Sequence, residues 1–486
     1  MLISDYLLIF FKNNLLIIHN FCAIISGHLI KVGIEKTGGV VMGQEVDYSS
    51  KEEIKKVQLQ KLNDLLMFVN QNNAFYSAKY LGIKFPLNSL AELENLPFST
   101  KKEFVNDQDD FPPLGKNHSY PEENYIRYHQ TSGTTGRPLK VLDTAESWDW
   151  LADCWVKVFR SVGVTKHDRL FLAFSFGPFI GFWTAYEGAK KVGALVIPGG
   201  GQTSLERLQS IITNKATVLV CTPSYALHME EVAKEAGIDL SQTSIRITIH
   251  AGEPGASVPA VRDKIEQIWG AVCYDHSGMT EVGVVSYSCA AKTGLHCNES
   301  GYIVEVIDPD TLKPVANGEK GELVLTNLGR WGYPAIRYRT HDFVIKNETI
   351  CSCGNPNILL PGGIIGRTDD MMIVRGVNIF PPSIEAILRE FLELVEFRIV
   401  LYTIAGMDQV KVEVELSDYS ENNQPQNNQT LDKMRKLLRE RIGLRIEVEL
   451  KASHSLPRFE MKARRTIDQR SSRETKNLGK SNLEAM

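Results

Sequence analysis

The sequence is poor in three features that would each define a class of protein. It has 8 cysteines in 486 residues, too few for a disulfide framework. Its net charge is −4, so it lacks the basic excess of a nucleic-acid-binding protein. It also lacks an apolar run of about 18 residues, the length that a membrane-spanning helix needs. We therefore expect a globular, cytoplasmic protein with no nucleic-acid partner and no membrane span.

The two ends of the chain differ in composition from the rest. Residues 1–41 carry short apolar runs broken by polar residues, without the basic start and small-residue cleavage site of a secretory signal. Two interpretations stay open: a weak interfacial helix, or a non-native extension upstream of Met42, which we favour. Residues 469–486 are polar and lack a core pattern, so we expect a disordered tail.

Strand and helix patterns alternate through the middle of the chain. Apolar residues at helical spacing first predict a helix over residues 52–70. The segments that follow are a strand at 170–176, a helix at 179–191, a strand at 194–198, a helix at 204–213, a strand at 217–221, a helix at 226–236, a strand at 245–250, a helix at 258–269 and a strand at 271–274. Such alternation predicts βαβ units, and hence a mostly parallel sheet with helices on both faces.

The pattern changes after residue 301. Strands without intervening helices are predicted at 302–308, 321–326 and 343–350, which indicates a small β subdomain. A compact α+β set follows, with a helix at 381–390, strands at 397–402 and 410–416, a polar surface loop at 417–430, a helix at 431–441 and a strand at 445–450. The predicted fold is therefore α/β. A large N-terminal domain, 42–367, precedes a small mobile C-terminal domain, 368–468.

A glycine- and hydroxyl-rich stretch within residues 128–140 reads YHQTSGTTGRPLK. Glycines at 133 and 136 permit positive φ, and successive backbone N–H groups in such a turn can surround an anion. The stretch lacks the Gly-Lys-Ser/Thr of a Walker loop. It predicts a polyphosphate-binding loop, and an ordinary polar surface loop is the alternative. Its candidate binding residues are Thr131, Ser132, Gly133, Thr134, Thr135 and Gly136.

Further motifs follow the predicted phosphate loop in a fixed order. They read YDHSGMTE at 274–281, YRTHD at 338–342, GRTDD at 366–370 and LPRFEMK at 456–462. Together with the loop they resemble the adenylate-forming superfamily of acyl-CoA ligases, peptide-synthetase adenylation domains and luciferases. The details resemble the phenylacetate–CoA ligase branch most. The resemblance runs from about residue 49 to residue 468.

The resemblance implies an ATP-dependent, AMP-forming ligase. Such an enzyme adenylates a carboxylic acid, here an aromatic one similar to phenylacetate, and transfers the acyl group to coenzyme A. The small acid and CoA are the implied partners, and the chain is expected to be a monomer or a homodimer. Two alternatives stay open: an enzyme that loads an acyl or peptidyl carrier protein, and a nucleotide-binding homologue without catalysis.

The resemblance also assigns catalytic roles to particular residues. Residues 131–136 would hold the β- and γ-phosphates of ATP, and Thr280 would donate to the α-phosphate. Glu281 would bind Mg²⁺, a hard cation that prefers carboxylate oxygen. Lys462 would reach the α-phosphate and the attacking carboxylate, although Met461 stands where the family often has glycine.

Further residues are assigned to the nucleoside and to domain movement. Asp342 would accept from the ribose hydroxyls with Arg367 beside it, and Asp369 would be the hinge of the C-terminal domain. The segment around the adenine would comprise Ala251, Gly252, Glu253, Tyr274 and Asp275. His341 replaces the usual glycine before Asp342, so a positive φ there would be strained.

Four residues of one third of the chain form a candidate zinc set: Cys289, His296, Cys351 and Cys353. Three thiolates and one imidazole suit tetrahedral Zn²⁺, and four protein ligands would make the site structural. Some members of the phenylacetate-ligase branch carry a zinc at this place. The ligands would pin the loop 282–301, which leaves Glu281, to the β subdomain. Cys297 is an alternative to His296, and a group of unrelated reduced thiols is the other interpretation.

Overall fold

The computed structural model describes residues 50–131, 137–253, 255–368, 370–375, 377–404, 407–417, 424–459 and 463–470, with four short strands before residue 32. The chain divides into two compact units, Met1–Tyr48 and Ser49–Met486. The strands of the first unit are β1 (Ile9–Phe11), β2 (Asn14–Leu16), β3 (Cys22–Ile25) and β4 (His28–Lys31), paired as β1–β2 and β3–β4. The described residues of this unit are extended, and the choice between the two interpretations of residues 1–41 stays a prediction.

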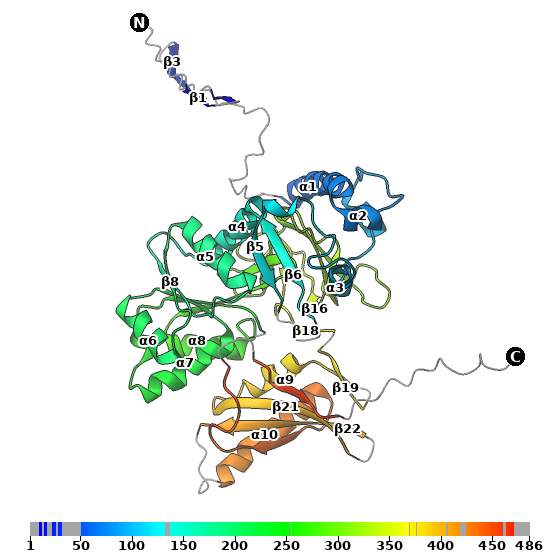
Figure 1. The fold of residues 1–486 in the computed structure, drawn as a ribbon. Helices are drawn as coiled ribbons and strands as arrows, with labels where there is room; N and C mark the ends of the chain where they lie inside the picture. Colours follow the sequence, from blue (N-terminus) through cyan, green and yellow to red (C-terminus); the bar gives the residue numbers. More distant parts are fainter. Residues whose placement is uncertain are drawn as a thin grey trace, which may run out of the picture. The chain divides into compact units, whose positions relative to one another are not determined.

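The main sheet of the second unit has eight strands in the order β17-β13-β12-β11-β10-β9-β7-β8. Its parallel half confirms the predicted βαβ alternation. Helices α4 and α5 pack together on one face, and α6, α7 and α8 lie on the other (Figure 1). The elements are α4 (Ala145–Ser161), β7 (Arg169–Leu172), α5 (Ile180–Val192), β8 (Leu195–Pro198), α6 (Ser204–Thr213), β9 (Val218–Cys221), α7 (Pro223–Glu235), η3 (Leu240–Gln242), β10 (Ile247–His250), α8 (Pro259–Trp269) and β11 (Val272–Met279).

The other half of this sheet is antiparallel and corrects the sequence analysis. The segment 282–301, expected as a loop, contains β12 (Gly283–Ser288) and β13 (Leu295–Cys297), and β17 (Leu359–Leu360) completes the edge. Every residue of β12 is buried, its serines included, so the strand has no polar face that would produce alternation in the sequence. Strand β11 also continues to Met279, beyond its predicted end at residue 274.

Helices and a hairpin precede the main sheet. Helix α1 (Lys51–Asn72) confirms the predicted amphipathic helix, because its buried side chains lie at helical spacing. The hairpin of β5 (Tyr125–Gln130) and β6 (Lys140–Thr144) flanks the predicted phosphate loop, which is therefore the connection between two paired strands. The remaining elements of this region are α2 (Ala74–Lys79), η1 (Leu90–Asn95), α3 (Lys101–Asp110) and η2 (Glu122–Asn124).

The predicted β subdomain is an antiparallel sheet of order β14-β15-β16-β18. Its strands are β14 (Tyr302–Ile307), β15 (Lys320–Asn327), β16 (Tyr338–Ile345) and β18 (Gly366–Arg367). Strand β16 begins at Tyr338, not at the predicted residue 343, so the motif 338–342 lies inside the strand. Its side chains alternate between buried and half-buried, but polar residues occupy both sets and hide the period of two.

Within the second unit, the described residues from 370 to 470 have their own hydrophobic cluster, which includes Ile384, Phe397, Val412 and Met434. We call these residues the small part and residues 50–368 the large part. The small part contains β19 (Met372–Val374), β20 (Val377–Ile379), α9 (Pro381–Leu388), β21 (Leu394–Ile404), β22 (Met407–Leu416), α10 (Gln424–Ile442), β23 (Glu447–Leu450) and β24 (Thr466–Asp468), with the sheet order β23-β22-β21-β24.

Helix α10 corrects the prediction of a polar loop over residues 417–430. It begins at Gln424, inside that segment. The asparagine- and glutamine-rich start lacks an apolar stripe, and the helix gains its packing further along, where Leu431, Met434 and Leu438 are buried.

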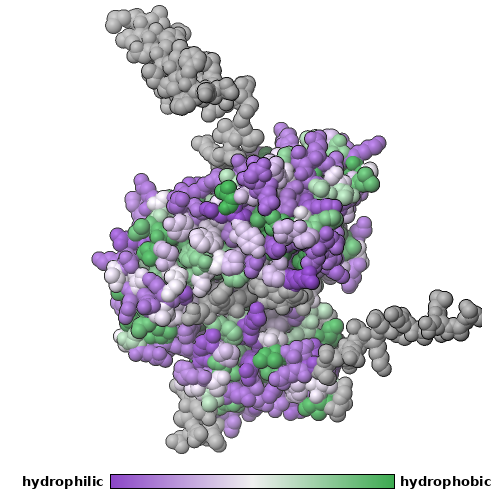
Figure 2. Space-filling model, viewed as in Figure 1, coloured by the Kyte–Doolittle hydropathy of each residue, from purple (hydrophilic) through white to green (hydrophobic). Residues whose placement is uncertain are grey.

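The described helices include none with the length and apolar character that crossing a bilayer requires. Figure 2 shows one face of the molecule, where hydrophilic side chains dominate and hydrophobic ones are scattered in small groups. Scattered apolar side chains are ordinary for a folded surface and carry no argument for a partner.

Candidate active site

Glu281 lies in the turn that joins β11 to β12. Its side chain is nearly buried, and its Oε1 lies 3.4 Å from Nζ of Lys101 at the start of α3. The backbone of the turn is held from beneath, because a terminal nitrogen of Arg330 donates to the carbonyl oxygens of Thr280, at 2.8 Å, and Glu281, at 3.2 Å. The carboxylate predicted to hold Mg²⁺ thus sits on a fixed turn with one lysine beside it.

The support under this turn is an ion pair that the sequence analysis missed. The Nε of Arg330 donates to Oδ1 of Asp143 at 2.6 Å, and its second terminal nitrogen donates to Oδ2 at 2.7 Å. Both side chains are 0% exposed. Burial alone lowers the pKa of Arg330, but the Asp143 carboxylate more than offsets this, so the pKa lies above its ordinary value. Arg330 therefore stays charged and tied to β6.

Asp342 and Arg367, the residues assigned to the ribose, are brought together by the register of β16 and β18. A terminal nitrogen of Arg367 donates to Oδ1 of Asp342 at 2.7 Å. Asp342 is 7% exposed, and Arg367 keeps about a third of its side chain accessible. A carboxylate oriented by an arginine at an open edge can accept hydrogen bonds from paired hydroxyls.

His341 adopts the backbone conformation that the sequence analysis anticipated for its position. Its φ is +63°, in the left-handed region that favours glycine. Two contacts compensate this strain: the Nδ1 of His341 lies 3.0 Å from Oγ1 of Thr368, and its backbone N–H donates to Glu322 at 3.3 Å. These contacts hold His341, the residue before Asp342, in a conformation that glycine would adopt without strain.

Residues 251–253 follow β10 and contribute a bridging carboxylate. Glu253 accepts hydrogen bonds from the backbone N–H of Ser224 at 2.8 Å and from that of Ala463 at 2.9 Å. Gly252 has a φ of +93°, a backbone conformation that residues other than glycine rarely adopt. Because Ala463 directly follows Lys462 in the sequence, this contact links the large part to the segment that carries the predicted catalytic lysine.

Tyr274 and Asp275 lie within β11, not at its end. The ring of Tyr274 has Nζ of Lys292 at 5.5 Å from its centroid, and its assignment to adenine stays a prediction. Asp275 is 8% exposed and accepts a hydrogen bond from the Ser257 hydroxyl. Burial raises the pKa of Asp275 to about 7, so its proton is lost near neutral pH.

The base of the predicted phosphate loop is closed by Thr131. Its backbone N–H donates to the Leu139 carbonyl at 2.9 Å, and its Oγ1 accepts from the Leu139 N–H at 3.0 Å. The basic residues of the stretch have protein partners: Arg137 pairs with Asp109, and Lys140 donates to the Pro113 carbonyl at 2.9 Å. The predicted residues that lie outside the described ranges are Ser132, Gly133, Thr134, Thr135, Gly136, Asp369 and Lys462.

The predicted sulfur–imidazole set comes together as a cluster at the edge of the main sheet. The ligand atoms of Cys289, His296, Cys351 and Cys353 all lie within 4.8 Å of one another. The Sγ of Cys353 is 3.4 Å from Nε2 of His296, and the sulfurs of Cys289 and Cys351 are 3.9 Å apart. The other ring nitrogen of His296 faces the Asn357 carbonyl at 3.4 Å, as in metal sites where a backbone oxygen orients the imidazole.

The thiols of this cluster differ in acidity. Burial tends to raise the pKa of Cys351, but hydrogen bonds from the Cys353 backbone and from Thr293 outweigh it and lower the pKa to about 6. Burial raises the pKa of Cys289 to about 11. Cys297, the alternative ligand, is fully buried and is not a member of the cluster.

The fold and the order of the placed motifs define an adenylate-forming enzyme. Residues 70–329 match the family model described as AMP-binding enzyme, and residues 376–470 match AMP-binding enzyme C-terminal domain. The chain belongs to the AMP-binding enzyme family.

Similar proteins cover most of the chain. It is 32% identical to phenylacetate-coenzyme A ligase of Pseudomonas putida over 87% of this chain and 96% of that protein. The Escherichia coli (strain K12) protein of the same name is 31% identical over 87% and 97%.

A 2-hydroxyisobutyryl-CoA ligase is similar in structure and has been solved in several states. In the postadenylation state, in complex with R3-HIB-AMP, it matches with a TM-score of 0.80 at 30% identity, over 86% of this chain and 90% of that chain. In complex with 2-HIB-AMP and CoA in the thioesterification state, the TM-score is 0.65 at 31% identity, over 87% and 91%.

Proposed function

We propose that the protein is an ATP-dependent ligase that adenylates a carboxylic acid and transfers the acyl group to coenzyme A. The observation that carries this proposal is the match of both parts of the chain, in order, to the two models of one family. The curated relatives named phenylacetate-coenzyme A ligase support CoA as the acceptor and an arylacetic acid as the substrate. Loading of a carrier protein stays the alternative.

The reaction proceeds in two displacements. An oxygen of the acid carboxylate attacks the α-phosphorus of ATP, and the bond to the leaving pyrophosphate breaks. The CoA sulfur then attacks the acyl carbon and AMP leaves. Both steps depend on positioning and on neutralisation of phosphate charge, without a protein nucleophile.

The described residues fit these tasks. Glu281 offers a nearly buried carboxylate, which suits a Mg²⁺ ion that would neutralise phosphate charge. Thr280, on the same turn, would donate to the α-phosphate. The Asp342–Arg367 pair would hold the ribose hydroxyls, and residues 251–253 with Tyr274 and Asp275 would line the nucleoside. Lys462 and the hinge at Asp369 stay assignments from sequence.

Aromatic side chains of α5 and of the segment between β7 and α5 support an aryl acid. The rings of Phe174 and Phe182 stack with centroids 3.4 Å apart, and Phe176 contacts Trp183 edge to face at 4.9 Å. Trp155 contacts His276, in the motif that ends at Glu281, with centroids 4.4 Å apart. A planar apolar acid would pack among such rings.

A hydroxy acid is a second candidate substrate. The Nδ1 of His276 is buried and has no hydrogen-bond partner among the described residues. A substrate hydroxyl would satisfy it, and the similar solved enzyme is named a 2-hydroxyisobutyryl-CoA ligase.

A panel of carboxylic acids in a pyrophosphate-release assay tests the proposal. Arylacetic acids should release pyrophosphate with ATP alone and yield an acyl-CoA once CoA is added. A preference for small hydroxy acids would favour the second candidate. Acyl transfer to a carrier protein but not to CoA would favour the carrier-loading alternative. ATP binding without pyrophosphate release for any acid would indicate a homologue without catalysis.

We further propose that Cys289, His296, Cys351 and Cys353 hold one structural Zn²⁺. The compact set of three sulfurs and one imidazole nitrogen supports this ligand chemistry, because zinc prefers such donors in tetrahedral arrangement. The ion would fasten the β12–β13 connection to the segment before β17. It would not contact substrate.

Elemental analysis of purified protein should find about one zinc per chain, as four ligands in one site imply. The double variant Cys351→Ser, Cys353→Ser should lose the zinc and melt at a lower temperature. The matched control is Ser352→Ala, an exposed residue between the two cysteines, which should retain the ion. If purified wild-type protein contains no zinc, the proposal is wrong and the cysteines of the cluster are ordinary reduced thiols.

The remaining predictions are kept as proposals. Separate hydrophobic clusters support a boundary between domains 42–367 and 368–468. The cytoplasmic location and the choice between monomer and homodimer stay predictions from sequence.

A further inference from the structure

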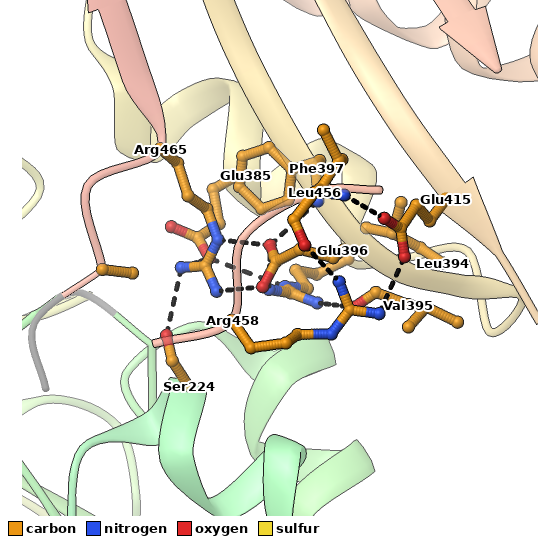
Figure 3. Close-up of polar contacts among 12 residues, drawn as sticks. Ser224, Glu385, Leu394, Val395, Glu396, Phe397, Glu415, Leu456, Arg458 and Arg465 are labelled. Atoms are coloured by element: carbon orange, nitrogen blue, oxygen red, sulfur yellow. Dashed lines mark hydrogen bonds and ion pairs between the residues drawn. The ribbon is translucent and has the colours of Figure 1, made fainter. Parts of the chain in front are cut away.

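A cavity of about 550 Å³ lies where helices α7 and α8 of the large part face the small part. Its lining is rich in charge and includes Glu231, Lys264, Arg389, Glu396, Arg458 and Arg465. Several of these side chains bridge the two parts through hydrogen bonds and ion pairs. Figure 3 shows the arginine–carboxylate network at this boundary.

Arg458 makes the first bridge. Its Nε lies 3.0 Å from Oε2 of Glu231 on α7, while a terminal nitrogen donates to Glu415 of β22 at 2.7 Å. The Glu415 carboxylate also accepts from the Leu456 N–H, so it fixes the segment that carries Arg458 (Figure 3). Glu415 belongs to the small part, and Glu231 belongs to the large part.

Arg465 makes the second bridge. It pairs with both oxygens of Glu396 in the small part, at 2.6 and 3.0 Å, and its other terminal nitrogen donates to the hydroxyl of Ser224 at 3.0 Å. Ser224 lies in the first turn of α7 in the large part. Figure 3 shows Arg465 between these two partners.

Contacts to backbone atoms also join the two parts. Lys264 of α8 donates to the Leu394 carbonyl at 3.1 Å, and the Ala463 N–H donates to Glu253 at 2.9 Å. Arg458, Ala463 and Arg465 flank Lys462 on both sides in the sequence. The segment that includes the predicted catalytic lysine is therefore fastened to the large part at each end.

The similar ligase offers two arrangements for comparison. At nearly the same identity and coverage, the TM-score is 0.80 with its postadenylation state and 0.65 with its thioesterification state. The arrangement of this chain is thus more similar to the former. The bridges described above belong to that arrangement.

We propose that Arg458 and Arg465 are positioning residues that hold the small part in the orientation in which the acid is adenylated. This inference rests on the proposed ligase activity. We call the Arg458–Glu231 and Arg465–Ser224 contacts the interface clamp. All its atoms are polar, so water can replace each partner when the small part turns away for the thioester step.

The charge state of Glu231 supports a clamp that persists at neutral pH. Burial tends to raise the pKa of Glu231, but hydrogen bonds from His228 and Arg458 outweigh this and lower it to about 2. The groups that act on Glu231 are His228 on the same helix and Arg458 from the small part, and Lys264 of α8 also interacts with it. The carboxylate is consequently ionised wherever the enzyme is folded at ordinary pH.

Glu231→Lys tests the clamp, because it places a cation opposite Arg458. The rate of pyrophosphate release from acid and ATP, without CoA, should fall about tenfold, within the usual range for coupling between distant groups. CoA transfer from a supplied acyl-adenylate should stay within about twofold of wild type, since the clamp is open in that step. Ser224→Ala should slow only the first step, by a smaller factor.

The matched control is Glu235→Lys, the same substitution at an exposed position on α7 that lines no part of the cavity. It should leave both steps unchanged. Equal losses in the two half-reactions of Glu231→Lys, or unchanged adenylation, would overturn the assignment. A fall in both steps with a lowered melting temperature would show a structural role only.

Hydrogen–deuterium exchange distinguishes failure of the clamp from failure of the proposed activity. In wild type, the amides of Leu456 and Ala463 are bonded to Glu415 and Glu253. Residues 456–465 should exchange faster in Glu231→Lys than in Glu235→Lys, whatever the enzyme acts on. Unchanged exchange would refute the clamp even if the ligase activity is found, and inactivity of wild type with every acid would refute only the activity.

Discussion

Arg330 and Asp143 meet with neither side chain exposed, whereas Arg458 and Glu231 keep 19% and 25% of their side chains accessible to solvent. The first pair lies within the large part and supports the turn that carries Glu281. The second joins the large part to the small one. An ion pair sealed from water is costly to separate, and one at the rim of a cavity can exchange its partner for water. The contrast fits a proposed nucleotide site that stays fixed and a proposed clamp that can separate.

Lys462→Ala, a change in the small part, is expected to have the largest effect on activity. The substitution should abolish adenylation, because the lysine is assigned to the α-phosphate, but spare CoA transfer from a supplied acyl-adenylate. The two half-reactions, measured separately, check this. Equal loss in both would contradict the assignment of Lys462.

Glu281→Ala tests the proposed metal ligand in the large part, on the turn that Arg330 supports. Activity should fall by orders of magnitude without a matching loss of stability, since Glu281 is proposed to hold the metal and its turn is fastened by backbone contacts to Arg330. Moderate extra Mg²⁺ should not restore turnover. Near-normal turnover would mean that another group holds the metal.

Arg330→Leu should reduce the free energy of unfolding by about 3–5 kcal/mol, because it leaves Asp143 buried without its partner. Chemical denaturation measures the loss. The double variant Arg330→Leu, Asp143→Leu removes both charges and should recover much of the stability. A loss below about 1 kcal/mol, as found for exposed pairs, would show that the Arg330–Asp143 pair is no harder to separate than the partly exposed Arg458–Glu231 pair.

Asp275→Asn should change how stability depends on pH. The pKa of Asp275 is raised to about 7 in the folded state from an ordinary 3.8, so the folded state binds the proton more tightly. Protonated Asp275 therefore adds to the free energy of unfolding. This addition, at most about 4 kcal/mol, is fully present below about pH 4 and is lost as the pH rises to about 7. The Asn variant should lack this slope in denaturation measured at several pH values. Asp263→Asn, at an exposed position on α8, should keep it.

His341→Gly should have the smallest effect. Relief of a strained φ and loss of the bond to Thr368 are each worth about 1 kcal/mol, so the free energy of unfolding should change by less than about 1 kcal/mol. His341→Val should be clearly worse, because a β-branched residue tolerates positive φ poorly. Equal stabilities of the two variants would show that the backbone strain has no cost.

Elements with local signals were predicted well. Helix α6 begins at Ser204 as predicted, where Thr203 and Glu206 form a capping box. The cysteine–histidine set was predicted from residue types together with the family resemblance, with Cys297 as an alternative to His296, and the structure brings the four members together. Asp342 and Arg367 were predicted to be neighbours from the family resemblance, and the strand register agrees.

The misses share a physical cause. Arg330 and Asp143 are 187 positions apart, and neither stands in a pattern that marks it as buried. Lys101 reaches Glu281 from a helix far earlier in the chain. Such pairs exist only after the sheet has formed, so the sequence near each residue carries no trace of the partner. Strand β12 was hidden for a related reason: burial on both faces removes alternation.

The Arg330–Asp143 pair also bears on how the protein can be divided. The residues that match the larger family model end at 329, one position before this arginine. A fragment that ends at residue 329 would bury Asp143 without its positively charged partner, below the turn that carries Glu281. During synthesis, Asp143 likewise has no such partner until Arg330 has been added and has left the ribosome. A fragment meant to fold by itself should therefore include Arg330 together with Asp143.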